Sequence, residues 1–450
     1  MPIKGLDMSL DKKMMAYIES SKKEIEAIAN DLYNRPEAGF KEFETQAYLE
    51  NYLDKMQIPY ETFEGMTGVK VTLSSGKDGP SVALIAELDA VICPQHKDSA
   101  ETGAVHACGH NIMMSDVLFV IDLFIRLDVM KELTGNVHFL FVPAEEYLEM
   151  DYRQSLIKDG IIKYPTGKAE CISRGIFDDV DISVMIHAIS HDKKICLEGG
   201  SNGFVAKKAI FTGKASHAAS APEKGKNALY AANLGLTAIN AIRETFVNSG
   251  NIRVHPVIHT NQQAVNVIPS EVVVETFVRA NSVETVLDTN LKVDRALIGS
   301  AYAIDCDIRI ENTPGMLPLT MNKGLTDLGE SVGHLIVGND VTHLVPSSGS
   351  TDLGDVSSLM PAIETCIGCI KGGLHSPDYE VIDKETAYVF ATQYLALMAY
   401  ELLKDQASLA KQIIEEYEPV FKTKKDYFDF LDSMFSNKTY KADILGGTCG

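Results

Sequence analysis

Two imidazoles and one thiol lie close together in the sequence, in the stretch Val105–Asn111. Cys108 and His110 are separated by a single glycine, so an extended or tightly turned backbone can direct both side chains toward one point. Thiolate and imidazole are the ligands that zinc and its first-row neighbours prefer. One interpretation of the spacing is half of a transition-metal site. Taken alone, the stretch favours a buried cysteine beside two ordinary histidines, because free cysteine is common in protein cores; the residues further along the chain change that balance.

Other polar groups follow runs of apolar residues that we predict to be buried strands. Open α/β sheets bind their ligands at the carboxyl ends of such strands. Strands that alternate with helices predict an α/β fold with a mainly parallel, helix-flanked sheet. The runs and the residues that follow them are 81–85 with Glu87 and Asp89, 137–142 with Glu145 and Glu146, and 182–186 with His187.

The hydrophobic pattern changes after Gly199–Gly200. Between residues 204 and 311 it predicts the order β-α-β-β-α-β, which is that of a ferredoxin-like unit. A unit of this size fits a small domain inserted into a larger one. We therefore expect a catalytic domain formed by 1–200 and 313–450, interrupted by a second domain at 201–312. The segment 150–175 and the charged tail beyond Asp405 give no firm prediction.

Helices are predicted where apolar residues recur at helical spacing. None of the apolar runs reaches the length of about 18 residues that a membrane span needs. The predicted helices of the larger domain are 10–33, 44–56, 117–127 and 386–403.

The composition of the 450 residues is that of a globular protein, with 45% hydrophobic and 23% charged residues. A net charge of −21 excludes nucleic acid as an expected partner, because the field would repel phosphates. Eight cysteines are too few for a disulfide scaffold, so we expect a cytoplasmic protein. Cys366 and Cys369 have redox spacing, but their apolar neighbours favour core packing.

The ordered set of candidate residues resembles the dinuclear metallo-aminoacylase and carboxypeptidase family. The similar branch holds bacterial N-acyl-amino-acid amidohydrolases, plant auxin-conjugate hydrolases and p-aminobenzoyl-glutamate hydrolases. The resemblance extends over residues 20–400. Gly349–Asp352, and Asn111 where the branch often has Asp, are most similar to the p-aminobenzoyl-glutamate hydrolases and dipeptidase-like members. The motifs that carry it are His106–His110, Pro143–Glu146, Gly213-x-x-x-His217-Ala218-Ala219 and Asn266–Ser270.

The resemblance implies two divalent transition-metal ions per subunit, with Zn or Mn expected and Co or Ni also accepted by such ligands. Glu145 would be the general base that takes a proton from a metal-activated water and passes it to the leaving amine. Asp89 would orient a ligand, and Glu87, which departs from the family pattern, is better read as a structural carboxylate. The implied metal ligands are Cys108, His110, Glu146, His187 and His375, with Cys108 a candidate for sharing between the ions.

The resemblance also assigns tasks to the inserted domain, which would act as a lid and as the contact of a homodimer. His217 would reach the partner subunit's active site and stabilise the oxyanion, against the alternative of an ordinary surface histidine. Asn266 and Arg279 would hold the substrate's carboxylate or carbonyl, although Arg279 could equally form a structural ion pair. Among the remaining histidines, His255 is the best candidate to line the site.

These residues predict a metal-dependent amidohydrolase. Its substrate would be a small molecule with an amide-linked amino acid: an N-acyl amino acid, a p-aminobenzoyl-glutamate-like conjugate or a dipeptide. One alternative is a catalytically inactive binding protein on the same fold. Another makes Cys108 a nucleophile with His106 or His110 as its base, which leaves the acidic residues without a task.

Overall fold

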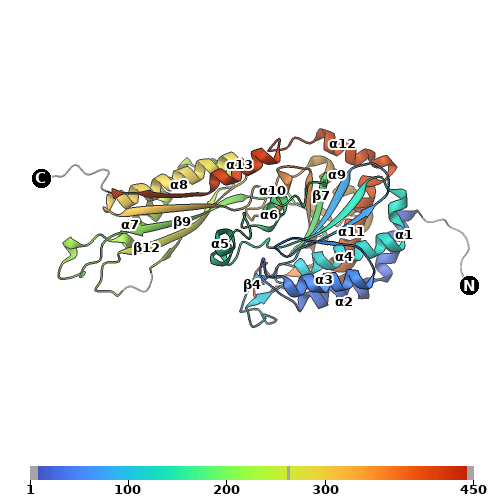
Figure 1. Cartoon of the computed structure of the whole chain (residues 1–450), viewed down its shortest axis with the longest axis horizontal. Coiled ribbons are helices and arrows are strands. Elements are labelled where there is room, and N and C mark those ends of the chain that lie inside the picture. The colour runs from blue at the N-terminus through green and yellow to red at the C-terminus, as the bar shows by residue number, and fades with distance from the viewer. Residues whose placement is uncertain (1–8, 261–263, 443–450) are drawn as a thin grey trace, which may run out of the picture. The chain divides into compact units, whose positions relative to one another are not determined.

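The computed structural model describes residues 9–260 and 264–442, so the outer ends of the first and last predicted segments, 1–8 and 443–450, lie outside it. Within these residues the backbone forms two units, labelled by element in Figure 1. The first unit contains the described chain up to Gly199, together with Thr320–Pro346 and Asp355–Val420. The second contains Gly200–Leu319, Ser347–Gly354 and the described chain from Phe421.

The first unit is built on an eight-stranded, mainly parallel sheet with the order β1-β2-β6-β3-β7-β15-β8-β14. The central strand β3 is parallel to both of its neighbours, β6 and β7. All seven residues of β3 are buried, as expected for a strand that is covered by helices on both faces. The bounds are β1 Glu61–Thr62, β2 Val69–Ser74, β3 Ser81–Glu87, β6 Asn136–Val142, β7 Ile182–Ile189, β8 Ile195–Leu197, β14 Val341–His343 and β15 Ala362–Gly368.

Helix α4 (His110–Arg126) contacts β3 and β7, as does α11 (Ala391–Leu403). The two helices also contact each other, and α2 (Lys22–Tyr33) packs against α4 (Figure 1). The sequence placed the start of α4 at Val117, but the helix begins seven residues earlier, at the first residue after Gly109. His110 is therefore the first residue of the helix, and Cys108 lies in the turn directly before it.

Several other boundaries differ from the sequence prediction. The helix expected over 10–33 is broken at Ser21 into α1 (Leu10–Ser20) and α2 (Lys22–Tyr33). Strand β7 continues to Ile189, so His187 lies within the strand and not after its end. A π-helical turn at Thr386–Phe390 precedes α11, where a single α-helix was expected. The segment without a firm prediction folds into α5 (Met150–Lys158) and α6 (Gly167–Ser173).

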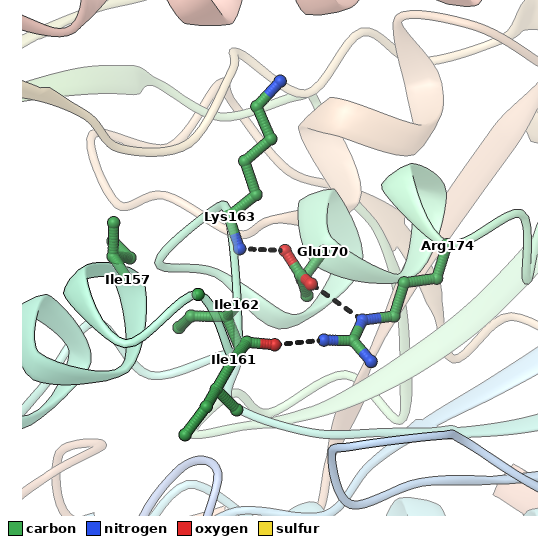
Figure 2. A pocket seen from close by; sticks show the side chains of 7 residues that line it. Ile157, Ile161, Ile162, Lys163, Glu170 and Arg174 are labelled. Carbon is green, nitrogen blue, oxygen red and sulfur yellow. Dashed lines mark hydrogen bonds and ion pairs between the residues drawn. The ribbon is translucent and has the colours of Figure 1, made fainter.

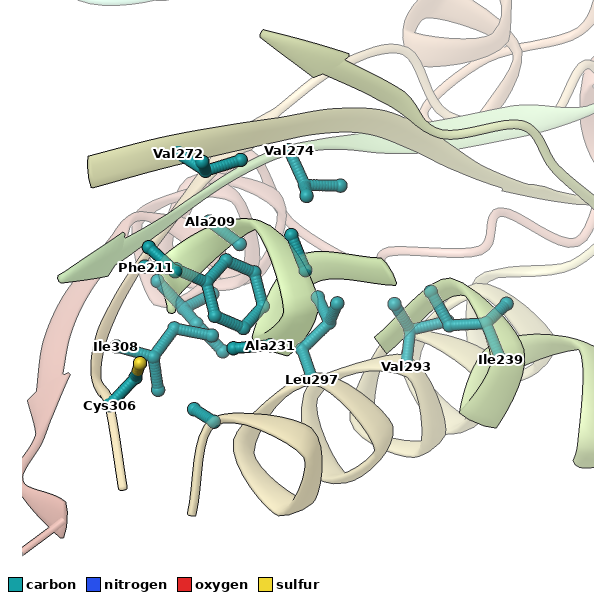
Figure 3. Packing of buried hydrophobic residues seen from close by; sticks show 14 of the residues in the cluster. Ala209, Phe211, Ala231, Ile239, Val272, Val274, Val293, Leu297, Cys306 and Ile308 are labelled. Atoms are coloured by element: carbon teal, nitrogen blue, oxygen red, sulfur yellow. The ribbon is translucent and has the colours of Figure 1, made fainter. Parts of the chain in front are cut away.

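The second unit has a six-stranded sheet with the order β10-β12-β9-β13-β18, and β11 also pairs with β12. Its elements follow the chain order β9-α7-β10-β11-β12-α8-β13, and α7 and α8 pack together against β9 and β12. Figure 3 shows their shared core, in which Phe211 points from the sheet toward Leu297 of α8. The bounds are β9 Gly203–Thr212, α7 Ala228–Ala241, β10 Arg253–Val254, β11 Val257–His259, β12 Glu271–Ala280, α8 Val283–Ala303 and β13 Asp307–Pro314.

The tail contributes to both units. Helix α12 (Ser408–Glu416) packs against α11 in the first unit. Strand β18 (Ser436–Tyr440), preceded by α13 (Lys424–Met434), pairs with β13 and covers that edge of the second sheet. Among the described residues there is no helix long and apolar enough to cross a membrane. The remaining elements are α3 Phe43–Lys55, β4 Val91–Ile92, β5 Ala104–Val105, α9 Lys323–Val337, α10 Leu353–Ser357, β16 Ile370–Lys371, β17 Glu380–Val381 and short 3-10 turns.

Candidate metal centre

Gly109 lets the chain turn sharply between Cys108 and His110. Its φ of 89° lies in the left-handed region that L side chains avoid. A Cβ at this position would also lie 2.7 Å from the Cβ of Ala188 and 3.1 Å from the hydroxyl of Tyr379. The glycine thus brings the thiol in the turn and the first imidazole of α4 to the same end of the sheet.

The imidazole of His110 is fixed by the loop that follows β3. Its Nδ1 lies 2.8 Å from the backbone oxygen of Asp89, and it must donate there because a carbonyl has no proton to give. The Nε2 atom is therefore the ring nitrogen that can bind a cation once it has released its proton. The carboxylate of Asp89 accepts a hydrogen bond from the backbone N–H of Glu146 at 2.9 Å. Asp89 thus contacts both His110 and Glu146, two of the predicted ligands.

The thiol of Cys108 lies between two further imidazoles. The Sγ atom is 3.3 Å from Nε2 of His187 and 3.3 Å from Nε2 of His375. His187 donates its Nδ1 proton to the backbone oxygen of Ala188 at 2.9 Å, so its Nε2 is also free to bind a cation.

Two groups of three potential ligands share this thiol. Within each group the ligand atoms lie within 4.8 Å of one another. In the second group, Nε2 of His375 is 2.9 Å from a carboxylate oxygen of Glu146. A catalytic zinc ion usually has three protein ligands, and its remaining coordination position is open to water or substrate. The first group is Cys108, His110 and His187, and the second is Cys108, Glu146 and His375.

The electrostatics of the centre fit a cation. Burial, together with the charges of Glu146 and Glu145, raises the pKa of the Cys108 thiol well above its ordinary value. Burial lowers the pKa of His110, but Glu87 and Asp89 outweigh it and raise that pKa to about 10. The protein alone therefore holds protons at both groups, and a divalent ion would displace them. The raised pKa also disfavours Cys108 as a free thiolate nucleophile.

A third group brings Glu145 to the same place. One ligand atom each of Glu87, His110 and Glu145 lies within 4.8 Å of the others, and all three residues are buried. Glu87 directs one oxygen toward Nε2 of His110 at 3.1 Å without completing a hydrogen bond. Potential ligand atoms that face one another without a hydrogen bond are expected at a cation-binding site. Glu87 therefore lies closer to the centre than a purely structural carboxylate would.

Two buried cations support this centre, and sequence reasoning found neither. Arg153 on α5 is 1% exposed and donates hydrogen bonds to the backbone oxygens of Ala144, Glu146 and Pro165. Lys168 on α6 is 0% exposed and pairs with Glu87 at 2.5 Å. Arg and Lys are seldom buried, so the polar pattern of 150–175 gave no sign of their role.

The pocket in Figure 2 lies beside these helices and has a volume of about 440 Å³; its lining residues are Ile157, Gly160, Ile161, Ile162, Lys163, Glu170 and Arg174. Its polar groups bind one another. Glu170 accepts hydrogen bonds from the backbone N–H of Lys163 at 2.9 Å and from Nε of Arg174 at 2.7 Å, and Arg174 also donates to the backbone oxygen of Ile161 at 2.5 Å. None of the predicted ligands lines this pocket, which is a structural junction of α6 with the loop before it.

The predicted lid residues all belong to the second unit. His217, Asn266 and His255 are exposed, and Nδ1 of His217 accepts hydrogen bonds from the backbone N–H groups of Ala219 and Ser220. Arg279 is half-buried, donates to Oγ of Ser350 at 2.6 Å and lies over the rings of Phe204 and Phe277. No ion pair of Arg279 occurs among the described residues, so the structural ion pair considered above is absent there.

Cys366 and Cys369 are buried free thiols in and just after β15. Neither belongs to a candidate ligand group within the described part of the chain, as their apolar neighbours indicated. His106 is also buried, and burial together with the charge of His110 lowers its pKa to about 3. The imidazole of His106 is therefore neutral at physiological pH and does not offset the negative charges of the acidic ligands.

Comparisons with known proteins identify the family of this chain. The sequence profile of Peptidase family M20/M25/M40 matches residues 83–401. Hippurate hydrolase of Campylobacter jejuni is 27% identical over 85% of this chain and 97% of its own length. N-acetyl-L-cysteine deacetylase of Bacillus subtilis is 24% identical over 86% of this chain and 90% of its own length.

The fold is shared with solved structures. A dinuclear metal-binding peptidase of the M20 family from Bacillus subtilis superposes with a TM-score of 0.67 at 21% identity, covering 86% of this chain and 99% of that one. The family profile matches more than half of the chain and contains the Cys108, Glu145–Glu146, His187 and His375 positions. The chain therefore belongs to Peptidase family M20/M25/M40, and it is a hydrolase that acts on amide bonds.

Proposed function

We propose that this protein hydrolyses the amide bond between an acyl or aminoacyl group and an amino acid, at a centre of two divalent ions. The observation that carries the proposal is the position of the Cys108 thiol, 3.3 Å from an imidazole nitrogen on either side. A thiolate in this position can serve both ions. His110 and His187 would complete one ligand set, and Glu146 and His375 the other.

When bound, the ions would supply Lewis acidity, lowering the pKa of a water and polarising the amide carbonyl. Glu145 would remove the proton from that water and deliver it to the leaving nitrogen. Its neighbour Glu146 is turned toward His375, so the two adjacent carboxylates serve different partners. Asp89 would keep the backbone of Glu146 and the ring of His110 in place through the two contacts described above.

We further propose that the second unit is a ferredoxin-like lid and dimerisation domain, corresponding to the inserted segment 201–312. Its order of elements and its strand order β10-β12-β9-β13 support this identification. Because β18 covers the β13 edge, a lid-to-lid contact of two subunits would use the face of α7 or the β10 edge. Tyr230 on α7 is 64% exposed, which suits such a contact.

His217, Asn266, His255 and Arg279 remain our candidates for substrate contacts from the lid. Arg279 is supported by its lack of a carboxylate partner among the described residues. Its guanidinium is stacked on Phe204 and Phe277. This stacking fixes the orientation of the N–H groups that could bind both oxygens of a substrate carboxylate. His217 would donate to the oxyanion in the partner subunit's site.

The names of two relatives support the proposed substrate class. Hippurate and N-acetyl-L-cysteine, in the names of two of them, are both amino acids acylated on nitrogen. Such a substrate presents a free carboxylate next to the amide that is cleaved.

All seven described cysteines are free thiols, which supports a reducing cytoplasm as the place of action. Zn and Mn are the ions that we expect first.

A hydrolysis screen tests the proposal. The purified protein is loaded with Zn, Mn, Co or Ni and incubated with N-acyl amino acids, p-aminobenzoyl-glutamate and dipeptides. We expect release of the amino acid with at least one ion, and loss of turnover by several orders of magnitude in Glu145→Gln with its metal content unchanged. Turnover that survives Glu145→Gln would remove the assignment of the base. Activity that persists after complete chelation would remove the metal mechanism.

A further inference from the structure

Lys168 is an ammonium group buried beside a cation site. The residue lies on α6, its side chain is 0% exposed, and its Nζ is 2.5 Å from Oε1 of Glu87, which is 1% exposed. The other oxygen of Glu87 faces Nε2 of His110 at 3.1 Å. The carboxylate of Glu87 thus lies between the Lys168 ammonium group and the imidazole nitrogen that would bind an ion.

The helix holds the ammonium firmly in this position. Gly167, the first residue of α6, packs so closely on the loop before Glu145 that a Cβ would lie 1.5 Å from the backbone oxygen of Pro143. At the other end, Glu170 and Arg174 join the helix to the loop 161–164. Lys168 directly follows Gly167, so the packed first turn of the helix by itself keeps the ammonium group beside Glu87.

A charge in this position must affect the binding of ions. The ligands proposed above include a thiolate and a carboxylate, and Glu87 and Glu145 lie beside them. Each additional negative charge strengthens the attraction for a divalent cation, and a buried ammonium opposes it, because charges interact strongly in a medium of low dielectric constant. Removing one partner of a buried ion pair also leaves the other without compensation.

We propose that Lys168 is a positioning residue that holds Glu87 by one oxygen and offsets its charge, so that the centre binds its ions less tightly than its ligands alone would. Lys168 maintains the folded protein before metal is bound and limits the affinity afterwards. The inference rests on the proposed metal centre, and it concerns a residue that is neither a ligand nor the base.

The test compares Lys168→Met with the wild-type protein. Methionine keeps the length of the side chain and removes the charge. The dissociation constant for Zn is measured by competition with a chromophoric chelator, and the melting temperature is measured with and without metal. We expect binding about tenfold tighter in Lys168→Met and a lower melting temperature of its metal-free form. If Lys168 only stabilised the fold, its replacement would lower both the affinity for Zn and the melting temperature.

Two further variants make the result specific. In Glu87→Gln/Lys168→Met the carboxylate charge is removed as well, so the affinity should return toward that of the wild type. Arg174→Met loosens the outer end of α6 without changing the charge at the centre, and its affinity should stay unchanged. If Lys168→Met does not fold, the comparison of the double variant with Glu87→Gln alone still isolates the ammonium, and tighter binding by the double variant is expected.

The outcomes separate this inference from the proposed function. Wild-type protein that binds no stoichiometric metal contradicts the centre itself. Metal binding by the wild type with equal or weaker affinity in Lys168→Met leaves the centre intact and overturns the role of Lys168.

Discussion

The Nδ1 atom of His110 donates to the backbone oxygen of Asp89 at 2.8 Å, while the Asp89 carboxylate accepts the backbone N–H of Glu146 at 2.9 Å. Asp89, which follows β3, therefore sets the tautomer of the His110 imidazole on α4 and the position of the loop after β6. The arrangement exists because β3 and β6 are adjacent parallel strands whose carboxyl ends meet at one edge.

Asp89→Asn should weaken metal binding about 10- to 100-fold, as loss of an orienting partner commonly does. The backbone oxygen that holds His110 is unchanged, but the amide has one acceptor oxygen, so its NH2 group would face either the backbone N–H of Glu146 or Nδ1 of His110, which lies 3.4 Å from the second carboxylate oxygen. Chelator competition gives the affinity. Asp116→Asn is the matched control, because Asp116 is equally buried on α4, receives a hydrogen bond from Thr392 at 2.8 Å, and has a pKa raised well above its usual value by burial. Equal affinities in the two variants would contradict the role of Asp89.

Gly109→Ala should destabilise the protein by about 3 kcal/mol, through a left-handed backbone that L residues avoid and overpacking against Ala188. Urea unfolding of the metal-free protein measures the loss. Gly160→Ala is the control, since its φ is 70° but nothing lies within 4 Å of the added Cβ. It should cost about 1 kcal/mol. A similar cost at both glycines would mean that the contact with Ala188 is not tight.

Arg153→Met should lower turnover about 100-fold at saturating metal, because a small displacement of the catalytic loop is sufficient for such a loss. The variant leaves the buried carbonyls of Ala144, Glu146 and Pro165 without this donor. Steady-state kinetics provide the measurement. Lys41→Met removes a more exposed cation, paired at 2.8 Å with Glu149, the residue before α5, and should change turnover little. Normal turnover in Arg153→Met would show that the loop holds its position without the arginine.

The pH dependence of stability should include a contribution from Asp179. Burial raises its pKa, but the hydrogen bond from Lys70 and the charge of His138 outweigh this and hold the pKa below the ordinary value of 3.8. A folded-state pKa below the unfolded one means that the contribution is complete above pH 4 to 5 and is lost as the pH falls through the folded value. The melting temperature of the metal-free protein should therefore fall more steeply below pH 4 than that of Asp179→Asn. Parallel curves for the two proteins would exclude this contribution.

Much of the centre could be predicted from the sequence because its residues follow short apolar runs. Cys108, His110 and the Glu145–Glu146 pair are placed by the ends of local elements, and a parallel sheet brings such ends together. The start of α4 could not be located, since Gly109 in a left-handed conformation precedes the helix where a side-chain cap is usual. His187 lies inside β7, but its side chain still reaches the thiol.

The parts that sequence could not provide depend on contacts distant in the chain. Lys168 and Arg153 look like surface residues until Glu87 and the carbonyls of the 144–146 loop are placed beside them. Likewise, β18 is a polar strand whose pairing with β13 spans more than a hundred residues, and its local pattern does not distinguish it from a loop.

The metal content of the purified protein tests the central claim most directly. After equilibration with Zn and removal of loosely bound ion, elemental analysis should find about two ions per chain in the wild type. His187→Ala and His375→Ala should each lose one, because each removes a donor from only one group, whereas Cys108→Ala should lose both. A wild-type protein without stoichiometric metal, or a Cys108→Ala variant that retains both ions, would contradict a centre built around a shared thiolate.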